Sequence, residues 1–154
     1  MELPLRWRIL AVCGSGILLP AAFAPDNARI LPWFCLVLFF QPLLGASPRV
    51  AVVCGLLYGF FFYTVSLRWI YGVMHDHGGL DPVSAAGVLF AFVMFLSIFP
   101  ITFALVFSYL SRRSMALACA AAPWLWVSME FARAHAPILG FPWNLLGYAA
   151  WYHL

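Results

Sequence analysis

The 154-residue chain is 66% hydrophobic and 8% charged, whereas soluble domains are about half apolar and a quarter charged. Its mean hydropathy of +0.98 therefore excludes an ordinary soluble domain and predicts an integral membrane protein. The net charge of +3 comes from scattered arginines with no lysine, which excludes a nucleic-acid-binding patch and predicts that the arginines determine topology.

Long apolar blocks separated by charges predict an all-α, polytopic transmembrane bundle that forms one domain. A membrane span needs about 20 predominantly apolar residues. The blocks predict about five spans, at residues 9–25, 30–48, 50–71, 82–111 and 114–133. The first block resembles a signal peptide, but Pro25 after its Ala-x-Ala pattern disfavours cleavage, so we expect a retained helix. Proline and glycine interrupt residues 134–154, which predicts an interfacial or re-entrant segment.

The distribution of arginine predicts the orientation of these spans. Five alternating spans with a cytoplasmic N-terminus place five arginines inside, namely Arg6, Arg8, Arg49, Arg112 and Arg113. The stretches "YGVMHDHGGLDP" and "GFPWNLLGY", which follow the third and fifth spans, then lie on the same outer face. We expect these two aromatic, glycine-containing segments to build a shared site there.

The polar motifs near these segments allow structural and functional interpretations. His75, Asp76 and His77 are residue types that bind zinc, but without a further strong ligand they favour a polar loop, and no metal is predicted. Asp81 and Pro82 are typical of the N-cap and first residue of a helix. Glu130 and Arg133 share a helix face, as a structural ion pair or as substrate contacts. Trp69 and Tyr71 are interfacial anchors or lipid contacts.

Three stretches then resemble a known family. "GFFFYTVSLRWIYGVMHDHGGL", "APWLWVSMEFAR" and "LGFPWNLLGY" are similar, in order and spacing, to the N-terminal membrane region of apolipoprotein N-acyltransferases. The resemblance implies a multi-pass protein of the bacterial inner membrane. It also implies a periplasmic nitrilase-like domain whose Glu-Lys-Cys triad takes an acyl chain from phospholipid, the donor. The acceptor is the N-terminal diacylglyceryl cysteine of a lipoprotein, and no dissociable cofactor is involved.

This resemblance predicts lipid or substrate contacts but no catalytic residue within the 154 residues. The candidate contact residues are Trp69, Tyr71, His75, Gly78, Gly79, Glu130, Arg133, Phe141, Pro142, Trp143 and Tyr148. The nitrilase-like domain is not in the sequence, so we expect a fragment or a truncated gene product that is inactive alone. Two alternatives stay open: the membrane domain of another lipid-linked enzyme, such as a polyprenyl-phosphate glycosyltransferase fusion, and a small non-enzymatic membrane protein.

Overall fold

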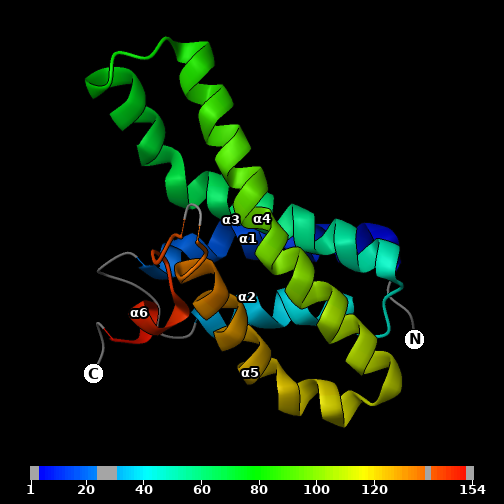
Figure 1. The fold of residues 1–154 in the computed structure, drawn as a ribbon. Coiled ribbons are helices and arrows are strands. Elements are labelled where there is room, and N and C mark those ends of the chain that lie inside the picture. The colour runs from blue at the N-terminus through cyan, green and yellow to red at the C-terminus, as the bar shows by residue number, and fades with distance from the viewer. Residues whose placement is uncertain (1–3, 24–30, 138–139, 152–154) are drawn as a thin grey trace.

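The computed structural model describes residues 4–23, 31–137 and 140–151, and throughout these ranges the regular structure is helical, as predicted (Figure 1). Two helices end in 3₁₀ turns and one ends in a π-helical turn. In chain order the elements are α1 (Leu5–Leu18) with η1 (Leu19–Phe23), α2 (Leu31–Phe40) with η2 (Gln41–Leu43), α3 (Pro48–Gly72) with η3 (Val73–His77), α4 (Pro82–Arg113), α5 (Met115–Ala134) and α6 (Leu146–Trp151).

Four of these helical segments are long and apolar enough to cross a membrane. They are Leu5–Phe23, Pro48–His77, Pro82–Arg113 and Met115–Ala134, so the chain is a multi-pass membrane protein. Where the second span was expected, at 30–48, the described residues before α3 form only α2 and η2, with ten α-helical residues and three in a 3₁₀ turn. At the usual helical rise this segment is about 20 Å long, less than the roughly 30 Å of a hydrocarbon core.

Helices α3 and α4 form the central hairpin of the bundle. They approach so closely that a Cβ added at Gly55 would lie 2.6 Å from the Ile101 Cα atom. Small residues at a crossing let membrane helices pack backbone to backbone. Pro100 lies inside α4 at this crossing and is buried, so the residue that disrupts helical geometry sits where neighbouring helices support it.

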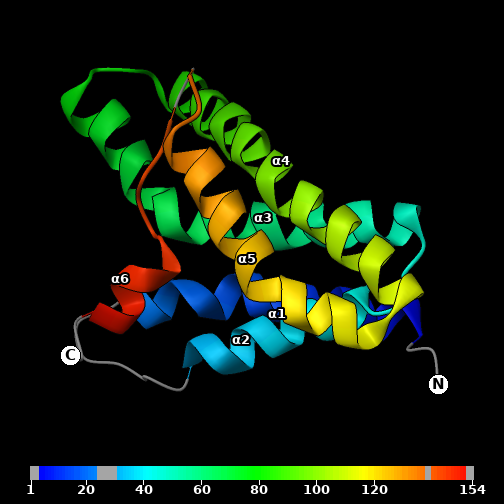
Figure 2. The ribbon, with the colours of Figure 1, turned by 60° about the horizontal axis from the view of Figure 1, so that its bottom comes forward.

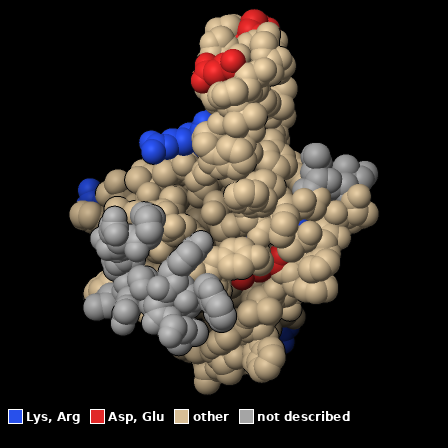
Figure 3. Space-filling model, turned by 90° about the vertical axis from the view of Figure 1, so that its left-hand side faces the viewer, with Lys and Arg blue, Asp and Glu red and all other residues tan. Residues whose placement is uncertain are grey.

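The α3–α4 hairpin extends beyond the rest of the bundle (Figures 1 and 3). Its two arms have 30 and 32 residues, whereas α5 has 20. Asp76 and Asp81 lie at the protruding tip, which carries acidic side chains in Figure 3. The sequence predicted a loop from His75 onward; instead, α3 continues as a π-helical turn to His77, because Gly78 N–H donates to the Val73 carbonyl 2.9 Å away.

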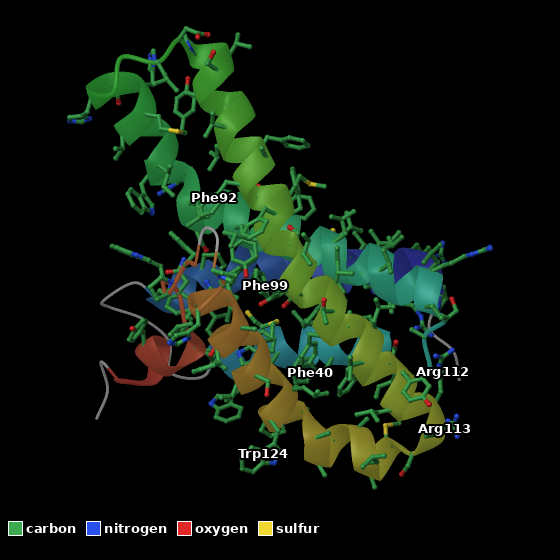
Figure 4. All side chains as sticks on the ribbon, in the orientation of Figure 1. Phe40, Phe92, Phe99, Arg112, Arg113 and Trp124 are labelled. Carbon is green, nitrogen blue, oxygen red and sulfur yellow. The ribbon has the colours of Figure 1, made fainter. Side chains whose placement is uncertain are left out.

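An aromatic cluster joins α2, α3, α4 and α5. Phe39 stacks on Tyr58 with ring centroids 4.0 Å apart, and Phe103 meets Trp126 edge to face at 5.4 Å. Phe40 points from α2 into the same region (Figure 4) and stacks on Phe103 at 5.1 Å. The short helix α2 is therefore fixed to the bundle by ring packing.

One end of the bundle collects arginines. Arg112 and Arg113 end α4 (Figure 4), and Figures 1 and 2 place the starts of α1 and α3 at this same end. Arg8 was expected before a first span starting at residue 9, but it lies inside α1, where it is 8% exposed. Its guanidinium donates to the Pro42 carbonyl within η2, so this charge also holds α1 against the turn after α2.

Candidate functional site

The segment after α5, here called the tail (residues 140–146), follows a non-helical path back over the bundle until α6 begins at Leu146. A Cβ at Gly140 would lie 2.8 Å from the Ala136 carbonyl oxygen, so only glycine fits there. Phe141 N–H donates to the Arg133 carbonyl at 2.9 Å. Asn144 has a φ of 55°, a left-handed conformation that asparagine tolerates better than most residues. These residues turn the chain toward Leu146.

Arg133 holds this irregular backbone. Its side chain is 2% exposed. Nη1 donates to the carbonyls of Phe141 and Trp143 at 3.1 and 2.7 Å, and Nη2 donates to the Asn144 carbonyl at 3.4 Å. The guanidinium carbon lies 5.8 Å from the centroid of the Tyr63 ring, a cation–π distance. Buried carbonyls outside a helix need donors, and this one side chain supplies three of them.

Glu130 holds the other end of the tail. Its Oε1 accepts the backbone N–H of Leu146, the first residue of α6, at 2.7 Å. The N–H groups at a helix start have no intrahelical acceptor, so this carboxylate acts as a cap supplied from a distant helix. The two charged residues that share a face of α5 thus bind the two ends of the tail, a structural role that neither predicted alternative described.

The tail places two aromatic residues against the α3–α4 hairpin. Phe141 meets Phe92 of α4 edge to face, with centroids 5.3 Å apart. Trp143 lies 5.7 Å from Trp69 of α3. Trp143 and Trp69 stay 56% and 47% exposed, so the pair forms a partly open aromatic surface beside the clamped backbone. Pro142 and Tyr148 are also exposed.

The other candidate residues lie toward the hairpin tip, which Figure 1 shows beyond the tail. His75 Nδ1 lies 2.8 Å from the Leu80 carbonyl, to which it donates, and its ring lies 5.7 Å from Tyr71. Gly79, with a φ of 69°, completes the turn after Gly78. Of the expected shared site, the structure brings together Trp69, Phe141 and Trp143, while these tip residues are occupied with their own turn.

Several residues of this site were missed in the sequence. Tyr63 and Phe92 read as ordinary apolar residues of a span, and only tertiary packing brings Phe92 against Phe141 and the Tyr63 ring against Arg133. Asn144 was treated as isolated, although Pro and Asn in close succession are a turn signal. Within the described ranges, no group of three or more His, Cys, Asp or Glu residues is placed to hold a metal ion.

Comparison with known proteins identifies similar sequences along almost the whole chain. Residues 15–154 match the family model described as "Apolipoprotein N-acyltransferase N-terminal domain". Proteins named apolipoprotein N-acyltransferase from Methylococcus capsulatus and Aquifex aeolicus are 35% and 38% identical over 147 and 133 residues. These alignments cover 92% and 86% of this chain but 28% of each relative. The chain therefore spans less than a third of the length of these relatives.

Proposed function

The chain belongs to the apolipoprotein N-acyltransferase family, and we propose that it forms the membrane part of an enzyme that acylates lipoproteins. In this reaction an acyl chain passes from a phospholipid to the N-terminal diacylglyceryl cysteine of a lipoprotein. The family match over residues 15–154 carries the proposal. It favours this function over a glycosyltransferase membrane domain or a non-enzymatic membrane protein.

Within this function, the tail contacts lipid substrate at the membrane surface. Trp69 and Trp143 expose large aromatic faces, and aromatic rings prefer the interface between lipid and water. Arg133 and Glu130 satisfy the tail's backbone internally, which lets irregular backbone lie next to lipid. The aromatic surface thus meets acyl chains or glycerol groups, and the buried charges position it.

We further propose that the protein lies in the bacterial inner membrane with its N-terminus in the cytoplasm. The arginine-rich end of the bundle then faces inward, and Asp76 and Asn144 face the periplasm. In a cysteine-free background, Asp76→Cys and Asn144→Cys should both react with an impermeant thiol reagent in intact spheroplasts. Reaction at one position only would contradict this topology.

The 154 residues are not expected to catalyse the transfer by themselves. Thioester catalysis needs an activated thiolate, and the family's triad adds a lysine, which this sequence does not contain. Cys35 and Cys54 are buried in apolar helices, where a charged thiolate is costly. The chain, reconstituted with phospholipid and a diacylated lipopeptide, should form neither a thioester nor a triacylated product. Product formation that depends on one of its four cysteines would disprove this.

A chimera tests the proposed function directly. This chain would replace the matching N-terminal part of the Methylococcus capsulatus relative, and N-acylation of a diacylated lipopeptide would be measured. We expect an active chimera. In it, Trp143→Ala should slow acyl transfer by a factor that corresponds to on the order of 1–3 kcal/mol, the free energy that a large apolar contact contributes. Trp124→Ala is the matched control, because Trp124 on α5 is 77% exposed and points away from the bundle (Figure 4). An inserted but inactive chimera would contradict the proposal.

A further inference from the structure

A pocket lies at the arginine-rich end of the bundle, away from the tail. Its volume is about 410 Å³, within the range of about 300–1,000 Å³ that is typical of small-molecule sites. Its wall includes Arg8 from α1, Arg112 from the last turn of α4 (Figure 4) and Ser47 at the start of α3. The fold thus brings two arginines from distant parts of the sequence to one pocket.

Hydrogen bonds between the surrounding elements hold the wall of this pocket in place. The Arg8 guanidinium donates to the Pro42 carbonyl. Gly45, which also lines the pocket, donates its N–H to Ser111 Oγ, 3.0 Å away. The Ser111 hydroxyl donates in turn to the Ser108 carbonyl at 2.9 Å. Because these bonds tie α1 to η2 and the turn before α3 to the end of α4, the pocket is a built part of the bundle.

The charge of the pocket is positive among the described residues. The described acids lie elsewhere, with Asp76 and Asp81 at the hairpin tip and Glu130 beside the tail. Ser47 and Val50 add the first turn of α3 to the wall, where backbone N–H groups carry a partial positive charge. Guanidinium groups bind phosphate through paired N–H donors, so a phosphate anion is the ligand that this wall suits.

The place of the pocket in the bundle indicates where this phosphate comes from. One membrane-spanning helix begins at Leu5 and another ends at Arg113, so the pocket lies where the hydrocarbon core meets the headgroups. Leu5 and Val50 give the wall an apolar part beside the arginines. A soluble anion has no use for an apolar wall, whereas a phospholipid carries its phosphate next to glycerol and acyl chains.

We propose that this pocket binds the headgroup of an anionic phospholipid, whose phosphate contacts Arg8 and Arg112. Basic pockets between membrane helices bind anionic headgroups in this way. A zwitterionic headgroup adds a positive charge that the two arginines repel, so the pocket selects anionic lipid. The site does not depend on the proposed acyl transfer; only its assignment to the cytoplasmic leaflet rests on the proposed topology.

Native mass spectrometry of the 154-residue chain in detergent tests the site directly. The chain is titrated with phosphatidylglycerol, which is anionic, or with phosphatidylcholine of the same acyl chains, which is zwitterionic. We expect one phosphatidylglycerol to be retained at concentrations at which phosphatidylcholine is not. Inorganic phosphate in excess over the lipid should not displace it. Equal retention of the two lipids, or displacement by inorganic phosphate, would overturn the proposal.

A charge substitution then locates the binding site. Arg112→Gln should lower the affinity for phosphatidylglycerol about fivefold, the contribution of one basic residue near a membrane surface. Arg113→Gln is the matched control, because it removes the same charge from the next position. Arg113 lies outside the pocket wall and donates from Nη2 to Tyr109 Oη at 3.2 Å, so its substitution should leave the affinity unchanged. Equal losses in the two variants would reveal a general charge effect and overturn the site.

A steric substitution tests the pocket without changing any charge. Val50→Phe adds a ring to the wall and should abolish the preference for phosphatidylglycerol over phosphatidylcholine. Val53→Phe is the same change on the same helix, at a side chain that is 42% exposed and outside the pocket wall, and it should keep the preference. If the Val50→Phe chain binds phosphatidylglycerol as the Val53→Phe chain does, the lipid does not occupy this pocket.

Discussion

The hairpin tip and the tail are both irregular, but their backbones are satisfied in different ways. At the tip, Gly78 N–H and Leu80 N–H donate to the Val73 and Met74 carbonyls, a few residues earlier. In the tail, three carbonyls accept hydrogen bonds from the side chain of Arg133, which belongs to the preceding helix α5. The tip is therefore a local structure, and the tail is a tertiary one.

This difference indicates how each region responds to change. The tip stands at the end of two long helices, outside the bundle (Figure 3), and its turn depends on residues within the same stretch. The tail depends on the side chains of Glu130 and Arg133 on α5, which its backbone contacts only in the folded chain. Substitutions of Glu130 or Arg133 should therefore move the tail and its aromatic surface while leaving the tip as it is.

Substitution of Arg133 should have the largest effect on the tail relative to the tip. Arg133→Met keeps a long apolar stem but leaves the carbonyls of Phe141, Trp143 and Asn144 without their donor. Since a hydrogen bond to a charged group contributes about 1.5–3 kcal/mol, labelling at Asn144→Cys should rise at least about tenfold, with no change at Asp76→Cys. Arg113→Met is the control, because that guanidinium contacts Tyr109 on its own helix. An equal rise at both positions would show that the whole fold, and not the tail, had loosened.

Removal of Glu130 should have a smaller effect, confined to the start of α6. Glu130→Ala leaves the Leu146 N–H without its acceptor, a loss of roughly 1–2 kcal/mol by analogy with helix caps. Hydrogen exchange at the Leu146 amide should accelerate accordingly. Glu130→Gln keeps an acceptor oxygen in a side chain of the same shape. In this variant the Leu146 amide should exchange at a rate between those of the wild type and Glu130→Ala. If the alanine variant matches the wild type, the carboxylate does not cap α6.

The regular parts of this fold follow from local chemistry and were predictable. Asp81 was predicted as an N-cap, and its Oδ1 accepts the N–H groups of Val83 and Ser84 at 3.1 Å. The long apolar blocks became long helices because lipid leaves backbone groups few other partners. These features depend only on residues close together in the sequence.

Features that depend on distant partners were not predictable. Hydropathy does not distinguish a span from the short helix α2, which ends at Phe40 and passes into the 3₁₀ turn η2; Gly45 then adopts a φ of 64°, and Ser47 caps the start of α3. The pair of Glu130 and Arg133 was recognised, but their backbone partners lie 8 to 16 residues away. The spacing of two residues on one helix does not show which atoms of another segment will contact them in the folded chain.

The smallest expected effect belongs to the tip and depends on pH. Hydrogen bonds from Ser84, first from its side chain and then from its backbone N–H, hold the pKa of Asp81 below its usual 3.8. A lowered pKa means that the folded chain favours the charged carboxylate. The cap's extra stability is then present above pH 3.8 and lost as the pH falls through the folded-state pKa. The side chain is fully exposed, so solvent screens the effect.

Asp81→Asn makes this expectation measurable, because asparagine also caps helices but carries no charge to lose. The ratio of hydrogen-exchange rates at Val83 and Ser84, variant over wild type, cancels the intrinsic pH dependence of exchange. This ratio should exceed one near neutral pH and fall toward one as the carboxylate is protonated. Exchange at Leu146 in the tail should be the same in both proteins at every pH, because that amide is held by Glu130. A ratio that stays constant as the pH falls would show that the charge of Asp81 adds nothing to its role as a cap.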